Sequence, residues 1–228
     1  MRDVLYVVIP AYNEQDTIGD VIKSWYNVVK EHDGEGKSRL VIINDGSKDD
    51  TYKIASELKK DYPLLEVIDK KNEGHGATVL YGYHYAIDNN ADYIFQTDSD
   101  GQTDPNEFAE FWENRENYDM VIGHRKGRED GISRVFVTKT LKYVLKLVFH
   151  VDVTDANTPF RLMKKDTLAK YIGLIPDGFN LSNVILSVIY KKKNLKVKYI
   201  KITFRPRQGG VNSINLKKIF GIGVKALK

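Results

Sequence analysis

The sequence predicts an α/β fold, with a doubly wound, mostly parallel β-sheet and helices on both faces. Short apolar runs alternate with helix-like segments through the first half of the chain, and this order is typical of strand-helix-strand crossovers. The 228 residues, 42% of them hydrophobic, suffice for a full core. The sequence has no internal repeat, low-complexity tract or Pro/Gly-rich linker, so we expect one domain over residues 1–228.

Four apolar runs predict buried parallel strands. They are rich in Val, Ile, Leu, Tyr and Phe, and the first ends at Pro10. The runs cover residues 4–10, 39–45, 64–70 and 92–98. Parallel strands end at one edge of a sheet, and in open α/β sheets ligands bind there.

Helix-like segments lie between these strands, at residues 15–31, 49–61 and 76–88. The first carries Ile18, Val21, Ile22, Trp25 and Val29 on one helical face. After about residue 125 the pattern loosens into a C-terminal elaboration that is mainly helical. There we expect helices over 133–150, 178–192 and from 214 onward, and a strand over 195–204.

Charge divides the chain into two halves. Residues 1–124 hold 12 Lys and Arg against 25 Asp and Glu, a net charge of −13, whereas residues 125–228 hold 23 against 6, a net charge of +17. An acidic half suits metal ions, and a basic half suits phosphates, nucleic acid or an anionic membrane surface. A solvated lysine surface explains the basic half about equally well.

Several classes of protein are excluded by what the sequence lacks. It has no cysteine, which excludes disulfides, thiolate zinc sites and cysteine nucleophiles, and its five histidines show no metal-binding spacing. The N-terminus lacks the zones of a signal peptide, and no apolar run reaches the roughly 18 to 20 residues needed to cross a bilayer. These features are compatible with the cytoplasm.

The predicted strand ends carry groups that suit a nucleotide. They bring together the segments PAYNE (10–14), NDGSKDD (44–50), KNEGHGA (71–77) and the acids Asp98 and Asp100. Small residues let a ligand approach the backbone, and acids can bind a base or ribose hydroxyls. Taken singly, NDGS is also an ordinary turn and helix cap, and GHG is too short for a dinucleotide fingerprint.

Asp98 and Asp100 stand one residue apart at the end of the fourth strand, and Asp104 follows closely. Such acids repel one another unless a cation lies among them. Mg²⁺ or Mn²⁺ fits, because hard divalent ions prefer oxygen ligands and often share them with substrate phosphates. Such an ion would stabilise the charge of a leaving diphosphate, and Gln102 could supply a further oxygen.

These segments resemble family 2 glycosyltransferases of the GT-A fold. The similarity lies in VVIPAYNEQDTI, VIINDGSKDDT, NEGHGATVLYGYHYA and TDSDGQTDP, the last carrying the D-x-D motif. DSDGQ, VIGHRKG, DANTPFRL and FRPRQGGVNSI resemble segments of polyprenyl-phosphate monosaccharide synthases, the dolichyl-phosphate mannosyltransferase-like branch. Thr158, Pro159, Asn212 and Ser213 depart from that branch's pattern, which bears on the acceptor more than on the donor.

The resemblance implies an inverting transfer of a monosaccharide from a UDP- or GDP-linked sugar. Its nucleotide would be held by Pro10, Ala11, Tyr12, Glu14, Asp45, Gly76 and Asp98, with Asp45 facing the base. Its metal ion, Mg²⁺ or Mn²⁺, would be held by Asp98, Asp100 and Gln102. Asp100, Asp155 and Arg161 are the candidate catalytic residues.

The acceptor is left open between a polyprenyl phosphate and a saccharide. A sugar hydroxyl needs a general base, for which Asp155 is the first candidate, whereas a lipid phosphate is already ionised and needs only positioning. The candidate acceptor-binding residues are Arg125, Arg134, Arg205, Arg207 and Ser213. Alternatively, Arg161 forms a buried ion pair with an acid such as Asp155, and Arg205 and Arg207 are surface charges.

Two basic, amphipathic segments favour a membrane surface. Lys139, Lys142 and Lys146 recur at helical spacing in 133–150, and residues 214–228 repeat the pattern. We therefore expect a cytoplasmic protein that is peripheral to the inner face of the membrane. A core helix with a solvated lysine face is the alternative, and the helical pattern at the C-terminus is compatible with a fragment of a membrane-anchored protein.

Three other functions fit the sequence less well. A nucleotidyltransferase would have a G-x-G-T-R loop where this chain has PAYNE. A nucleic-acid binder is disfavoured, because no such motif occurs and the acidic half would repel the phosphate backbone. A catalytically inactive binding module is disfavoured by the intact Asp98, Asp100 and Asp155.

Overall fold

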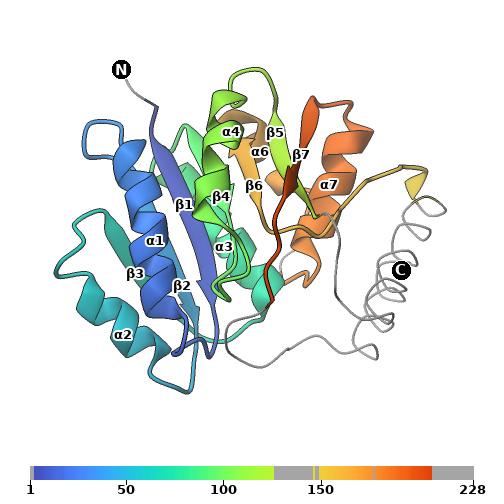
Figure 1. Cartoon of the computed structure of the whole chain (residues 1–228). Helices are drawn as coiled ribbons and strands as arrows, with labels where there is room; N and C mark the ends of the chain where they lie inside the picture. Colours follow the sequence, from blue (N-terminus) through green and yellow to red (C-terminus); the bar gives the residue numbers. More distant parts are fainter. Residues whose placement is uncertain (1–2, 126–145, 147–148, 177, 207–228) are drawn as a thin grey trace.

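The computed structural model describes residues 3–125, 146, 149–176 and 178–206, and these form a three-layer α/β/α arrangement (Figure 1). Within this part of the chain, seven strands make one sheet in the order β3-β2-β1-β4-β6-β5-β7. The strands are β1 (Leu5–Ala11), β2 (Arg39–Asp45), β3 (Leu65–Lys70), β4 (Tyr93–Gln96), β5 (Met120–Arg125), β6 (Arg161–Lys164) and β7 (Val197–Ile202). The pairings of β6 are antiparallel and the others are parallel, which confirms the predicted fold class.

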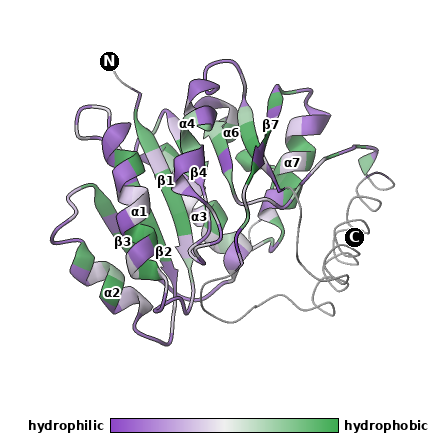
Figure 2. Cartoon of the chain, viewed as in Figure 1, coloured by the Kyte–Doolittle hydropathy of each residue, from purple (hydrophilic) through white to green (hydrophobic). Residues whose placement is uncertain are grey.

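The helices lie on both faces of this sheet. They are α1 (Ile18–Glu31), α2 (Thr51–Leu58), α3 (His75–Asp88), α4 (Phe108–Glu113), α6 (Lys165–Ile172) and α7 (Ser182–Lys192), with a short 3-10 turn, η1 (Pro105–Glu107). In Figure 2 the strands are largely hydrophobic, and hydrophilic residues gather on the outer surfaces of the helices and in the loops. Among the described residues, none of the helices combines the length and the apolar character that crossing a bilayer requires.

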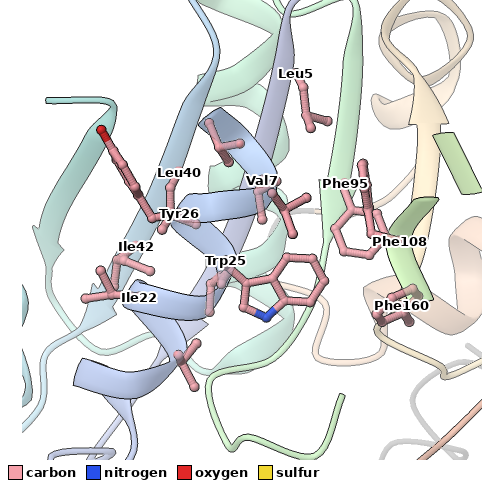
Figure 3. Close-up of a cluster of buried hydrophobic side chains, with 14 of the residues drawn as sticks. Leu5, Val7, Ile22, Trp25, Tyr26, Leu40, Ile42, Phe95, Phe108 and Phe160 are labelled. Atoms are coloured by element: carbon pink, nitrogen blue, oxygen red, sulfur yellow. The ribbon is translucent and has the colours of Figure 1, made fainter. Parts of the chain in front are cut away.

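The first face of the sheet is covered by α1, α2 and α4. Trp25 of α1 lies at the centre of this layer, with its ring centroid 5.2 Å from that of Phe95 on β4 and 5.8 Å from that of Phe160 (Figure 3). Phe108 packs edge-on against Phe95 at 4.9 Å. The predicted apolar face of residues 15–31 is therefore confirmed, because its side chains form this core.

The second face is covered by α3, α6 and α7. Val79 and Tyr83 of α3 pack with Leu186 of α7 and with Val8 of β1 in a second core cluster. α3 approaches the sheet closely at Gly82, where an added Cβ would lie 2.3 Å from Val8 Cγ1. Glycine is therefore needed at this position for the helix to pack.

The predicted strands and the helices of the first half are confirmed, as are α7 and β7 in the second half. α4, β5, β6, α6 and the 3-10 turn were not predicted. β6 has only four residues, and the apolar run of β5 ends at Gly123 and His124, so neither sequence shows a clear strand pattern. The helix expected over 133–150 falls almost wholly outside the described residues, and the one expected from 214 onward falls entirely outside them.

Chain direction brings segments from both halves to one edge of the sheet. The parallel strands end at this carboxyl edge, at the bottom of Figure 1. β6 runs the opposite way and so begins there, with Arg161 paired to Gln96 of β4 and Ile122 of β5. β7 lies parallel to β5, with Ile202 opposite Arg125, so the chain leaves the sheet at the same edge. Segments 155–160 and 203–206 therefore join the loops that follow β1 to β4.

Candidate active site

The turns that follow β1 and β2 are fastened to each other. The backbone N–H of Asn13 donates to Ser47 Oγ (3.0 Å), and that of Lys48 donates to Asn13 Oδ1 (2.8 Å). The N–H of Glu14 donates to Thr51 Oγ1 (2.8 Å) at the start of α2. Asn13 has a left-handed backbone conformation (φ 54°), which asparagine tolerates better than most residues. The two turns thus form one preorganised surface.

The predicted nucleotide-binding residues of this first turn differ in exposure. Pro10 and Ala11 are buried at the end of β1, and Glu14 is buried beside Thr17. Tyr12 is 39% exposed, which is high for an aromatic ring. Its ring is therefore accessible for stacking on a planar base.

Asp45, which we expected to face a base, is only 3% exposed and already has several partners. Its carboxylate accepts from Lys70 Nζ (2.9 Å) and from the backbone N–H groups of Glu73 (3.0 Å) and Gly74 (2.9 Å). Burial raises the pKa of Asp45, but the Lys70 ammonium and the backbone donors outweigh burial and hold the pKa below its ordinary value. Asp45 thus fixes the loop between β3 and α3. Its contact with a base stays a prediction.

Gly76, also predicted at the nucleotide site, has another reason to be glycine. An added Cβ would lie 2.3 Å from the carbonyl oxygen of Phe179 and 2.6 Å from the backbone of Asn180. The side of Gly76 on which a Cβ would stand is therefore filled by the segment that precedes α7, and its contact with a nucleotide stays a prediction. Gly74 precedes α3 and has a φ of 93°, a backbone conformation that few other residues adopt.

The D-x-D acids lie in the loop after β4. Asp98 is half-buried and its Oδ1 lies 3.1 Å from His75 Nε2 at the start of α3, whereas Asp100 is buried. Desolvation disfavours the charged imidazole, but the carboxylates of Asp98, Asp100 and Asp45 outweigh desolvation and raise the pKa of His75. The region around the D-x-D acids thus has a negative electrostatic potential, which attracts cations.

Ser99, the middle residue of the motif, anchors the loop to β1. Its hydroxyl donates to the carbonyl oxygen of Pro10 (2.9 Å), and its own carbonyl accepts from Thr17 Oγ1 (2.9 Å). Thr97 and Thr103 close the loop from within through their hydroxyls (2.8 Å). These bonds fix the backbone from which Asp98 and Asp100 project.

Gln102 completes the set of donors predicted for a metal ion. Its backbone N–H donates to Asp100 Oδ1 (3.1 Å), and its Nε2 donates to the carbonyl oxygen of Arg205 (2.8 Å). Two carboxylates and an amide oxygen suit Mg²⁺ or Mn²⁺. Among the described residues, no three His, Asp or Glu side chains gather as a metal cluster. A bound ion would therefore take its other ligands from water or from phosphates, which is common for Mg²⁺.

Arg125 and Asp155, predicted as acceptor-binding and catalytic residues, form one bidentate pair. Arg125 Nε donates to Asp155 Oδ2 (2.9 Å) and Nη2 donates to Oδ1 (2.7 Å). The side chains are only 8% and 9% exposed. The Phe204 ring covers the guanidinium at 5.1 Å. The acid proposed as a base is thus held by a cation.

Arg161, predicted as catalytic, is 0% exposed. Its Nε donates to the carbonyl oxygen of Thr158 (3.0 Å), Nη1 to that of Asn183 (3.1 Å) and Nη2 to that of Ala156 (3.2 Å). Burial lowers the pKa of Arg161. The guanidinium joins the start of β6 to α7 through backbone carbonyls, and a role of Arg161 in catalysis stays a prediction.

The remaining predicted acceptor residues divide into two groups. Arg205 is exposed, and its guanidinium donates to the carboxylate of Asp104. Arg134, Arg207 and Ser213 lie outside the described residues, as do Lys139 and Lys142.

Four positioning residues were missed in the sequence: His75, Ser99, Thr17 and Phe204. Their partners lie between 23 and 89 residues away, so no local pattern indicates the contacts. Only the position of Ser99 between two motif acids gave a signal that could have been used.

The chain matches a known protein family and several known proteins. The model of the family described as glycosyl transferase family 2 matches residues 6–172. A UDP-N-acetylglucosamine–dolichyl-phosphate N-acetylglucosaminyltransferase of Methanococcus voltae is 26% identical over 185 residues, which are 72% of this chain and 71% of that protein. A dolichol-phosphate mannosyltransferase of Pyrococcus furiosus is 25% identical over 222 residues, which are 94% of this chain and 60% of that protein.

Among solved structures, the fold is similar to that of glucosyl-3-phosphoglycerate synthase from Mycobacterium tuberculosis, in a complex with Mn²⁺, UDP and phosphoglyceric acid. The TM-score is 0.71 at 16% sequence identity, and the match covers 99% of this chain and 76% of the synthase. At this identity the likeness shows the fold alone.

Proposed function

Because the chain belongs to glycosyl transferase family 2 and has the GT-A fold, we propose that it transfers a monosaccharide from a nucleoside diphosphate sugar to a polyprenyl phosphate. The two relatives named above act on dolichyl or dolichol phosphate according to their names, which supports this class of acceptor. The Mn²⁺ and UDP of the structural neighbour support a divalent ion and a nucleoside diphosphate.

The donor would lie on the loops after β1 to β4. Tyr12 would stack on the base, and Asp45 would keep the loop from Lys70 to Gly74 in place beside it. Asp98, Asp100 and Gln102 would hold Mg²⁺ or Mn²⁺, which when bound supplies Lewis-acid stabilisation of the leaving diphosphate. An oxygen of the acceptor would then bond to the anomeric carbon from the opposite face as the bond to the diphosphate breaks.

The observation that carries the choice of acceptor is the bidentate pair of Arg125 with Asp155. A general base needs a lone pair within reach of the proton that it removes. Here the carboxylate is buried and both of its oxygens are turned toward a guanidinium, so Asp155 is poorly placed to take up a proton. A phosphate acceptor is already ionised and needs no base, so this pair favours a polyprenyl phosphate over a saccharide hydroxyl.

The basic half of the chain would hold the enzyme at an anionic membrane surface on the cytoplasmic side. Each Lys or Arg near such a surface contributes about 1 kcal/mol, and residues 125–228 carry a net charge of +17. Sedimentation with anionic liposomes should fall as salt rises, because charges are screened over roughly 10 Å at 0.1 M. A triple variant in which Lys139, Lys142 and Lys146 are replaced by Gln should sediment less. Sedimentation that depends neither on salt nor on these lysines would contradict a membrane role.

The activity can be tested with purified protein, Mn²⁺ and a panel of UDP- and GDP-linked sugars. We expect nucleoside diphosphate release to rise with a short-chain polyprenyl phosphate and not with soluble saccharides, and to stop in EDTA. Release with a saccharide alone, lost in Asp155→Asn, would instead identify a saccharide glycosyltransferase that uses Asp155 as its base.

A further inference from the structure

Residues 203–205, here called the strap, follow β7 and cross to the loop that carries the D-x-D acids. In Figure 1 this red segment descends beside the green loop after β4. The backbone N–H of Arg205 donates to the carbonyl oxygen of Gln102 (2.8 Å), and Gln102 Nε2 donates to the carbonyl oxygen of Arg205 (2.8 Å). The strap therefore holds Gln102 by two main-chain contacts.

The hydrogen bond between the Gln102 side chain and the strap decides which atom of the amide is available to a cation. An amide presents a donor nitrogen and an acceptor oxygen that point apart. Because Nε2 donates to the strap, Oε1 is the amide atom that is left to bind a cation. Without the strap the amide could rotate and offer its NH₂ group, which does not bind cations.

Two acids beyond Gln102 fasten the strap. Both carboxylate oxygens of Glu107 accept from the backbone N–H of Thr203 (2.9 and 3.0 Å). Asp104 accepts from the Arg205 guanidinium through one oxygen, and its other oxygen caps the 3-10 turn by accepting from Asn106. Neither acid is among the expected metal ligands.

The strap also reaches the acceptor side. Phe204 lies over the guanidinium of Arg125, which binds Asp155. One short segment thus contacts Gln102 on one side and the Arg125–Asp155 pair on the other.

We propose that Asp104 and Glu107 are positioning residues that hold the strap and thereby orient Gln102 Oε1 toward a divalent cation. The inference rests on the proposed function, because it assumes a metal ion at Asp98 and Asp100. Residues that orient metal ligands typically change metal affinity by about 10- to 100-fold when they are replaced.

The experiment measures Mn²⁺ binding in the presence of UDP by calorimetry, with GDP as a second probe. In the Asp104→Asn, Glu107→Ala double variant we expect the apparent Kd for Mn²⁺ to rise about tenfold. UDP affinity in EDTA should stay at the wild-type value. A second double variant carries Asp104→Glu in place of Asp104→Asn, together with Glu107→Ala. Because it keeps a carboxylate for Arg205, it should recover much of the Mn²⁺ affinity.

Glu110→Gln is the matched control, since Glu110 is exposed on α4 and its backbone carbonyl, not its side chain, binds Asn114. If the double variant unfolds, Asp104→Asn alone, which keeps an oxygen for the cap, must still weaken Mn²⁺ binding. A folded double or single variant that binds Mn²⁺ as tightly as the wild type would overturn the inference alone. A wild type whose UDP and GDP binding is indifferent to Mn²⁺ would overturn the proposed function with it.

Discussion

The two sides of the carboxyl edge are fastened in different ways. On the side that we propose binds the donor, here called the donor side, the turns after β1 and β2 are joined by single hydrogen bonds between side chains and backbone, such as that of Asn13 with Ser47. On the side that we propose binds the acceptor, here called the acceptor side, buried guanidinium groups hold the segments together, since Arg125 binds Asp155 and Arg161 binds three carbonyls.

This difference shows where the reactive groups lie. The donor side keeps Tyr12 and Asp98 accessible, with their surroundings already ordered. On the acceptor side, Asp155 and Arg161 are engaged within the protein, although both were candidates for catalysis. Under the proposed function, this side would therefore suit the placing of an ionised acceptor better than the activation of a neutral one.

The largest effect on turnover should come from breaking the donor side at Asp100. Asp100→Asn should lower turnover by about a hundredfold or more, because the loss of electrostatic stabilisation at a developing charge costs about 3 to 4 kcal/mol. Nucleoside diphosphate release measures turnover, and thermal unfolding serves as the control for an intact fold. If the wild type binds a nucleoside diphosphate equally tightly in EDTA and in Mn²⁺, the proposed metal site is wrong.

The next effect concerns the acceptor side. Arg125→Ala and Asp155→Ala should each lower the free energy of unfolding by about 3 to 5 kcal/mol, because each leaves a buried charge without its partner. The double variant should lose clearly less than the sum of the two. Denaturant unfolding of all four proteins gives the coupling energy, and strict additivity would mean that the pair does not interact in solution.

The donor side also contains one ion pair, Asp45 with Lys70, which holds the loop after β3 and whose contribution should depend on pH. The pKa of Asp45 is lowered by folding, so its stabilisation is present above the ordinary aspartate pKa of about 3.9 and is lost as pH falls below it. Asp45→Asn should cost about 3 kcal/mol at pH 7. The difference between wild type and variant should shrink below about pH 4.

Acid unfolding curves of the two proteins test this dependence. A difference that stays constant from neutral to acidic pH would show that Asp45 is not ionised in a stabilising pair. The donor KM of Asp45→Asn should rise by more than kcat falls, since the ordered loop serves ground and transition states alike.

Glycine substitutions test the contact between the start of α3 and the segment that precedes α7. Gly76→Ala should destabilise the fold by about 1 to 3 kcal/mol, because its Cβ would meet the backbone of Phe179 and Asn180. Gly173→Ala is the matched control, since an added Cβ there meets nothing within 4 Å. We expect that variant to stay within about 0.5 kcal/mol of the wild type in thermal or denaturant unfolding. Two equal effects would contradict the close approach at Gly76.

The smallest effect should come from the exposed ring on the donor side. Tyr12→Ala should raise the donor KM by about tenfold with little change in kcat, because stacking on a base is worth about 1 to 3 kcal/mol. Tyr52→Ala is the control, since Tyr52 is similarly exposed, at 42%, but lies on α2. Similar KM values for both variants would remove Tyr12 from the nucleotide site.

The sequence by itself determined the donor half. The strands that became β1, β2 and β4 are mainly apolar runs, and α1 carries its apolar face at helical spacing, so local patterns suffice for these elements. Asp98, Asp100 and Gln102 fall within a few residues of one strand end, and their joint placement could therefore be read without a structure.

Only the tertiary structure decided the acceptor half. The insertion of β6 between β4 and β5 depends on pairing between strands that are distant in sequence, and a four-residue strand carries too little pattern to predict it. The partner of Asp155 also needed the structure, because Arg125 and Arg161 are equally plausible in sequence. The strap binds Gln102 from 103 residues away, and contacts at such separation are fixed by packing rather than by local preference.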